Sequence, residues 1–135
     1  MSRSPGPRLA LAALLLATAL AACSKDDPPT TVTFGHGVAS GDPLADRVIL
    51  WTHVAPSRQE PVTLEWQVAT SAAFTTLAAS GAATTSAAAD YTAKVDVTGL
   101  AAGTTYWYRF RHGDQVSPVG RTKTCLLYTS PSPRD

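Results

Sequence analysis

Alternation of apolar and polar residues, which begins near residue 32, is the feature that most restricts how this chain can fold. Residues 62–69 read Val-Thr-Leu-Glu-Trp-Gln-Val-Ala, and residues 91–98 read Tyr-Thr-Ala-Lys-Val-Asp-Val-Thr. A period of two gives a segment one apolar and one polar face, as in an antiparallel sheet with one buried side. No stretch beyond residue 32 sustains the 3.6-residue period of a helix, so we expect an all-β domain.

Four further strands are expected from the same reading, at residues 34–40, 48–54, 105–111 and 116–123. Residues 48–54 are more uniformly apolar, which is typical of a strand near the centre of a sheet. Residues 105–111 and 116–123 should form a hairpin, because Gly113-Asp114 between them favours a tight turn.

The stretch from residue 71 to 89 is rich in Ala, Ser and Thr and is the least informative part of the domain. We expect one short strand at residues 75–79, followed by a loose loop at Gly81. A helical turn remains the alternative, because alanine favours helices in isolation.

About seven short strands over roughly 90 residues are typical of an immunoglobulin-like or fibronectin III-like β-sandwich. Trp66, in the middle of a strand, is expected to face the core. Tyr106 follows Leu100 and a glycine at the start of a strand, which indicates a tyrosine corner whose phenol bonds to the backbone near Leu100. We interpret all three residues as structural.

The N-terminus resembles a lipoprotein signal peptide over residues 1–22, which we expect to form a helix ahead of the sandwich. Two arginines precede residues 9–22, which carry no charge, and the run ends in Leu-Ala-Ala-Cys. On this interpretation Cys23 is the lipid anchor, the protein is attached to the membrane at the cell envelope, and residues 23–31 form a flexible tether. An ordinary secretory signal with a chance cysteine is the alternative.

The C-terminal residues 125–135 break every pattern before them. They resemble the conceptual translation of a transposase-type sequencing adapter over all eleven residues, so we expect this tail not to be native. A native tail rich in proline and serine is the alternative. With one thiol lipidated and the other in the tail, the two cysteines say nothing about disulfides.

Neither the charge balance nor the motifs indicate a catalytic, metal-binding or nucleic-acid-binding site in the chain. Between residues 23 and 124 there are eight lysines and arginines and nine aspartates and glutamates. This balance provides no excess of positive charge that would bind nucleic acid. Ser40 does not lie in a G-x-S-x-G elbow, and the three histidines lack metal-ligand spacing. Asp42 and Asp46 are better explained by a turn and a surface ion pair than by calcium binding. Sheet packing likewise explains Trp51 and Trp107 better than sugar stacking. We therefore assign no catalytic and no metal-binding residue to this chain.

A family resemblance rests on residues 34–43, Phe-Gly-His-Gly-Val-Ala-Ser-Gly-Asp-Pro, and on residues 46–52, Asp-Arg-Val-Ile-Leu-Trp-Thr. Both resemble the opening of the alkaline phosphatase D family, as do residues 91–100, 104–110 and 119–124. The resemblance implies that residues 32–124 are the N-terminal β-sandwich domain of a secreted phosphatase acting on phosphate mono- or diesters. His53 stands where the family usually has arginine.

The same resemblance implies that the chemistry belongs to a C-terminal metallophosphatase domain using iron and calcium, which this chain lacks. No cofactor is then expected in the fragment, and its partners would be that missing domain and the membrane. Cys125 does not match the family's iron-binding cysteine motif. The alternative is a stand-alone, fibronectin-like envelope lipoprotein that binds glycan or protein.

Overall fold

The computed structural model describes residues 27–127. The expected signal-peptide helix over residues 1–22, the lipid-anchor residue Cys23 and residues 128–135 lie outside this range.

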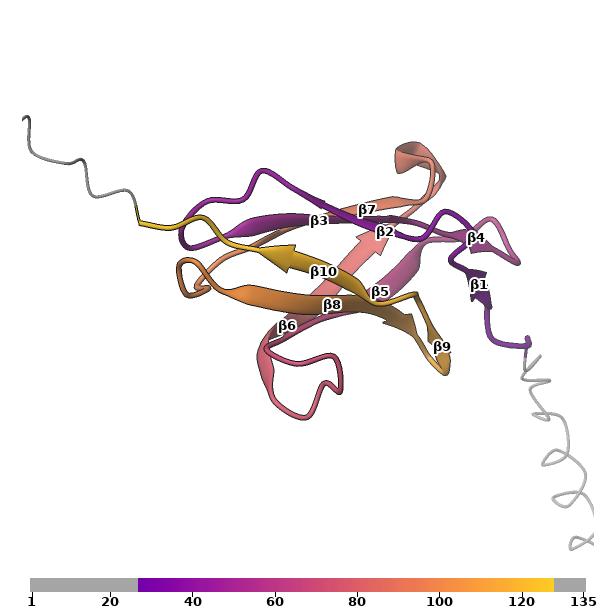
Figure 1. Ribbon diagram of the computed structural model, residues 1–135. Coiled ribbons are helices and arrows are strands. Elements are labelled where there is room, and N and C mark those ends of the chain that lie inside the picture. The colour runs from indigo at the N-terminus through magenta and orange to yellow at the C-terminus, as the bar shows by residue number, and fades with distance from the viewer. Residues whose placement is uncertain (1–26, 128–135) are drawn as a thin grey trace, which may run out of the picture.

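Two antiparallel sheets lie face to face (Figure 1). One has the strand order β2-β3-β7 and the other the order β10-β8-β5-β6, with β9 added beside β8. The first sheet is formed by β2 (Val38–Gly41), β3 (Val48–His53) and β7 (Thr92–Val97). The second is formed by β10 (Gly120–Lys123), β8 (Thr105–His112), β5 (Val62–Ala69), β6 (Leu77–Thr85) and β9 (Gln115–Val116). The expected all-β sandwich of about seven strands is confirmed, with three main strands in one layer and four in the other.

The core follows the alternation of the sequence. Val48, Leu50 and Thr52 of β3 are buried, while the residues between them face outward and are half-buried. In β8 the aromatic residues Tyr106 and Phe110 point inward in the same way. β3 lies at the centre of its sheet, as its apolar composition indicates.

The expectation for residues 71–89 is wrong in detail. Instead of a short strand at 75–79 and a loop at Gly81, one nine-residue strand, β6, runs through Gly81 and pairs with all of β5. Pairing with a well-patterned neighbour overrides the weak helix preference of alanine. The helical alternative survives only as a single 3-10 turn at Ala87–Ala89.

Two expected strands are shorter than the sequence suggests. The one at residues 34–40 begins only at Val38, because residues 34–37 form a turn in which the Gly37 N–H donates to the Phe34 carbonyl. The one at residues 116–123 is interrupted around Pro118, which has no N–H to offer a neighbouring strand.

Glycine meets an aromatic ring at both edges of the four-stranded sheet. Gly81 of β6 lies opposite Trp66 of β5, and a Cβ at Gly81 would come within 2.6 Å of the indole. Gly120 of β10 lies opposite Tyr108 of β8, and a Cβ there would overlap the phenol ring. Each inner strand therefore lays an aromatic ring over a glycine of the edge strand beside it.

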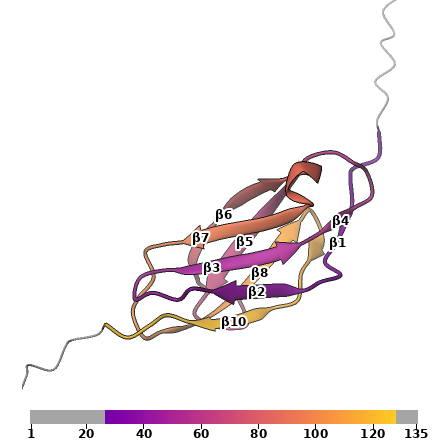
Figure 2. The same ribbon diagram turned by 90° about the horizontal axis from the view of Figure 1, so that it is seen from above.

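The described chain enters and leaves the sandwich at opposite ends (Figures 1 and 2). It enters beside the small ladder of β1 (Val32–Thr33) and β4 (Ala55–Pro56), and leaves where β10 ends, near the β2–β3 and β7–β8 loops. Eight strand residues, as in β8, span about 26 Å. The domain thus separates the two attachment points by about the length of its sheets.

The entry is held more firmly than a flexible tether would be. The Thr31 N–H donates to Ser57 Oγ and the Ser57 N–H donates to the Thr31 carbonyl. The Thr30 carbonyl lies 2.9 Å from His112 Nε2. The last two residues of the expected tether are therefore bound to the sandwich by hydrogen bonds.

Candidate functional site

The ionisable residues of the sandwich do not converge. Among residues 27–127 no group of three or more histidines, cysteines, aspartates or glutamates is placed to hold a metal ion. Within the same range no helix has the length and apolar character needed to cross a membrane.

The three histidines lie at two separate places. His36 and His53 meet edge to face, with ring centroids 4.7 Å apart. His112 places Nδ1 2.9 Å from the Thr63 carbonyl and Nε2 beside the Thr30 carbonyl. His53, which departs from the family pattern, is therefore a packing partner of His36.

Trp66, Leu100 and Tyr106, interpreted from the sequence as structural, all contact the core. Trp66 is partly buried and covers Gly81. Leu100 is buried, and the Ala101 N–H donates to Tyr106 Oη at 2.9 Å. This is the geometry of a tyrosine corner, in which a phenol on one strand fixes the loop that leads into it.

Four cationic side chains lie on the outer face of the sheet that contains β8 and β10. They are Arg109, Arg111, Arg121 and Lys123. Two of them stack on aromatic rings: Arg109 lies 4.1 Å from the ring centre of Phe74, and Arg121 lies 5.9 Å from that of Trp107. Trp107 thus packs against a neighbouring side chain on the sheet.

A groove of about 340 Å³ runs along β5 and β6, lined by Glu65, Trp66, Gln67, Ser80, Gly81 and Ala82. It holds one ionisable side chain, that of Glu65, so it offers no pair of groups for acid–base chemistry.

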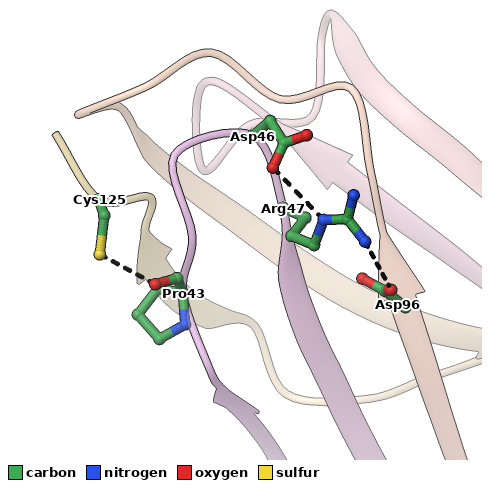
Figure 3. A network of polar contacts seen from close by, with 5 residues as sticks. All are labelled: Pro43, Asp46, Arg47, Asp96 and Cys125. Atoms are coloured by element: carbon green, nitrogen blue, oxygen red, sulfur yellow. Dashed lines mark hydrogen bonds and ion pairs between the residues drawn. The ribbon is translucent and has the colours of Figure 1, made fainter. Parts of the chain in front are cut away.

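The exit end of the sandwich carries a network of ion pairs. Arg47 forms ion pairs with Asp46 at 3.3 Å and with Asp96 at 3.4 Å (Figure 3). The hydrogen bond and charge of Asp46, and the charge of Asp96, raise the pKa of Arg47 above its ordinary value. The pairs are solvent-exposed and contribute little stability, but they link the β2–β3 loop to β7.

Beside this network the segment after β10 is hydrogen-bonded to the β2–β3 and β7–β8 loops. The Cys125 N–H donates to the Leu44 carbonyl at 3.0 Å, and the Gly103 N–H donates to the Cys125 carbonyl at 2.8 Å. Cys125 Sγ lies 2.9 Å from the Pro43 carbonyl (Figure 3). The stretch that carries the most specific family resemblance, residues 34–43, thus forms β2 and leads into the loop that holds the exit segment.

Comparison with known proteins assigns the family. Residues 18–126 match the family described as PhoD-like phosphatase, N-terminal domain. The chain belongs to this family. The PhoD-like resemblance of residues 34–124 is therefore confirmed.

Two relatives show how much of a PhoD protein the chain represents. Alkaline phosphatase D of Bacillus subtilis (strain 168) is 38% identical over 98 residues, which cover 67% of this chain and 17% of that protein. A solved chain described as the structure of PhoD is 37% identical, with a TM-score of 0.67, and the match covers 70% of this chain and 19% of that one. The chain thus spans less than a fifth of the length of either relative.

Proposed function

We propose that this PhoD-like domain is the N-terminal accessory domain of a secreted, metal-dependent phosphatase. The longer protein would hydrolyse phosphate mono- or diesters in a metallophosphatase domain located after residue 124. The observation that carries the proposal is the family match over residues 18–126, in a chain that spans 17% of its Bacillus subtilis relative.

In this proposal the metal-dependent chemistry belongs to the longer protein. Iron and calcium, the metals that the resemblance implies, find no ligand set between residues 27 and 127. Metal ions in phosphatases polarise the phosphoryl group and lower the pKa of the attacking water, and both roles need several converging ligands. Those ligands would belong to the catalytic domain.

The geometry suggests what the accessory domain contributes. Entry and exit lie at opposite ends, so a lipid at Cys23 and a domain after residue 124 would be held apart by the sandwich (Figure 1). In this proposal the protein is attached to the cell envelope, and the sandwich spaces and orients the catalytic domain relative to the membrane.

The test combines DNA sequence and activity. The coding frame is read from overlapping genomic DNA beyond the codon for Thr124, and the encoded longer protein is assayed on a nitrophenyl phosphate with added iron and calcium. We expect metal-dependent hydrolysis by the longer protein and none by the 135-residue chain. A native stop codon at that point would instead favour a stand-alone binding module, and metal-dependent turnover by the short chain would contradict the assignment of its residues.

A further inference from the structure

His112 places both of its ring nitrogens against main-chain carbonyl groups. Nδ1 lies 2.9 Å from the Thr63 carbonyl, and Nε2 lies 2.9 Å from the Thr30 carbonyl. A carbonyl oxygen only accepts hydrogen bonds, and a neutral imidazole has one N–H donor and one acceptor nitrogen. Both contacts are therefore hydrogen bonds at the same time only when each ring nitrogen carries a proton. In a neutral ring, one nitrogen lone pair would face a carbonyl oxygen.

The two carbonyl groups belong to parts of the chain that are held very differently. Thr63 lies in β5, two residues before Glu65, where the pairing of β5 with β8 ends. Its position is fixed, because β5 lies between two paired strands. Thr30 is 82 residues from His112 in the sequence and belongs to residues 29–32, here called the entry segment. When His112 can keep only one of the two bonds, Thr30 is therefore the partner that can move away.

The entry segment lies over the end of the β8–β9 hairpin. A hollow of about 200 Å³ separates it from residues 112–115, and the Val32 N–H donates to Gln115 Oε1 at 2.8 Å. Thr30 Oγ1 is buried and has no hydrogen-bond partner among residues 27–127. If the entry segment moved out, this hydroxyl would bond to water. The bound position thus has a cost, which the bond between the imidazole and the Thr30 carbonyl offsets.

The charged side chains near His112 are carboxylates and guanidinium groups. They are Asp114, which lines the hollow, Glu65 and Arg111, which pair in register across β5 and β8, and Asp27 and Arg58, which form an ion pair. Among these side-chain types and imidazole, only imidazole ordinarily changes charge between about pH 5 and pH 8. The other histidines, His36 and His53, contact each other at a separate place.

We propose that His112 is a proton-dependent latch on the entry segment. The imidazolium bridges the carbonyls of Thr30 and Thr63 and holds the segment against the sandwich. The neutral imidazole, formed when one ring proton passes to solvent, keeps its bond to Thr63 and releases Thr30. The inference concerns the described residues and does not depend on the proposed phosphatase. In the lipid-anchored protein proposed above, opening of the latch would lengthen the free part of the tether after Cys23.

The first experiment follows both sides of the latch in the 135-residue chain. Nitrogen NMR of the imidazole should show two ring protons on His112 at about pH 5 and one at about pH 8. Amide-exchange protection factors, which correct for the intrinsic effect of pH, are measured at the same two pH values. Those of Thr31 and Val32 should fall by about fivefold or more at the higher pH, because a hydrogen bond to a charged group is lost beside them. The factor of Val54, which donates to the Tyr91 carbonyl, should not change.

The second experiment compares His112→Phe with the matched control His36→Gln. Phenylalanine keeps an aromatic ring but has no N–H, so the protection of Thr31 and Val32 should be low and independent of pH. His36→Gln changes a histidine outside the latch and should keep the pH dependence of the parent. If His112→Phe also lowers the protection of Val54, the whole domain is destabilised. The ring protons of the parent then decide, since they need no variant.

Three results would overturn the latch. One is a His112 ring that carries a single proton at about pH 5. Another is protection of Thr31 and Val32 that is the same at both pH values in the parent. The third is a pH dependence that survives in His112→Phe or disappears in His36→Gln, which would assign it to another group. None of these results bears on the proposed function, whose test is the activity of the longer protein.

Discussion

At the scale of single residues, the polar groups of the core show which contacts stabilise the sandwich. Tyr106, which is buried, and Tyr91, which is partly buried, differ in how their hydroxyl groups are used. Tyr106 Oη accepts a hydrogen bond from the Ala101 N–H, whereas Tyr91 Oη is buried and has no hydrogen-bond partner among residues 27–127. The same chemical change at the two positions therefore tests the tyrosine corner directly.

Tyr106→Phe should lower the free energy of unfolding by about 1 kcal/mol or more, because it leaves the Ala101 N–H without its acceptor. This corresponds to a fall in melting temperature of about 4–8 °C for a domain of this size. Tyr91→Phe is the control and should leave stability unchanged or slightly higher, since it removes a buried hydroxyl that makes no bond. Equal destabilisation by the two substitutions in denaturant titrations would contradict the assignment of the corner.

Ionisation of Tyr108 should lower the stability of the sandwich at alkaline pH. Burial raises the pKa of Tyr108 above its ordinary value of about 10, and the nearby Ser40 hydroxyl opposes this shift to a smaller degree. The folded state therefore favours the neutral phenol, and its contribution to stability is fully present below the unfolded-state pKa near 10. It is lost as the pH rises from there through the folded-state pKa.

Unfolding midpoints measured between pH 8 and pH 11.5 should therefore fall above about pH 10. In Tyr108→Phe, which has no phenol to ionise, the fall should be smaller. An alkaline fall of equal size in both proteins would assign the limit to other groups.

At the scale of elements, each edge of the four-stranded sheet depends on a glycine beneath an aromatic ring. Glycine weakens a strand in isolation, but Trp66 over Gly81 and Tyr108 over Gly120 replace the missing side chain with ring contact. β6 is the clearer case, since its nine residues are Ala, Ser, Gly and Thr apart from Leu77. Its pairing with β5 and the indole of Trp66 supply packing that its own side chains do not.

Gly81→Ala and Gly120→Ala should each destabilise the domain by about 1–3 kcal/mol, because the new methyl group displaces a ring from its place against the edge strand. Gly41→Ala in β2 is the matched control, as a Cβ there meets nothing within 4 Å. Guanidinium denaturation measures the differences, and tryptophan fluorescence should also shift in Gly81→Ala. Identical stability of all three variants would show that the edge rings move aside freely.

At the scale of the whole molecule, the sandwich places its two connections at opposite ends and binds both. The entry is bound by Ser57 and His112, and the exit by the hydrogen bonds of Thr124 to the β7–β8 loop. In the function we propose, the sandwich would hold the segments attached at its two ends apart.

The proposed lipid anchor is tested at Cys23. Cells expressing the protein and fed an alkyne-labelled fatty acid should label it, and Cys23→Ser should remove the label and release the protein from the membrane fraction. More than one acyl chain is needed for lasting attachment, since each buried methylene contributes about 0.8 kcal/mol. Cys125→Ser should keep the label. A Cys23→Ser protein that stays labelled would exclude lipidation at this residue.

Much of the fold could be predicted from the sequence, because alternation with a period of two is a local property. It identified β3, β5, β7 and β8 to within about two residues, and through them the inward faces that form the core. The same reading failed where side chains carry little information. β6 is a strand because β5 offers a partner across the sheet, and no feature of its own residues separates strand from helix.

Polar contacts between neighbours in the sequence, such as the ion pair of Asp46 with Arg47 and the bond of Tyr106 to the loop before it, could be predicted, but longer-range polar contacts were decided by the tertiary structure. The pairing of His36 with His53 and the hydrogen bonds of the exit segment to the β2–β3 and β7–β8 loops join residues from different elements, so no local spacing indicates them. The sequence by itself determined the strand pattern and the family, since both depend on residue order. How the sheets meet, which edges need glycine and where the chain is held at its exit depend on contacts between distant segments, and these exist only once the two layers have packed.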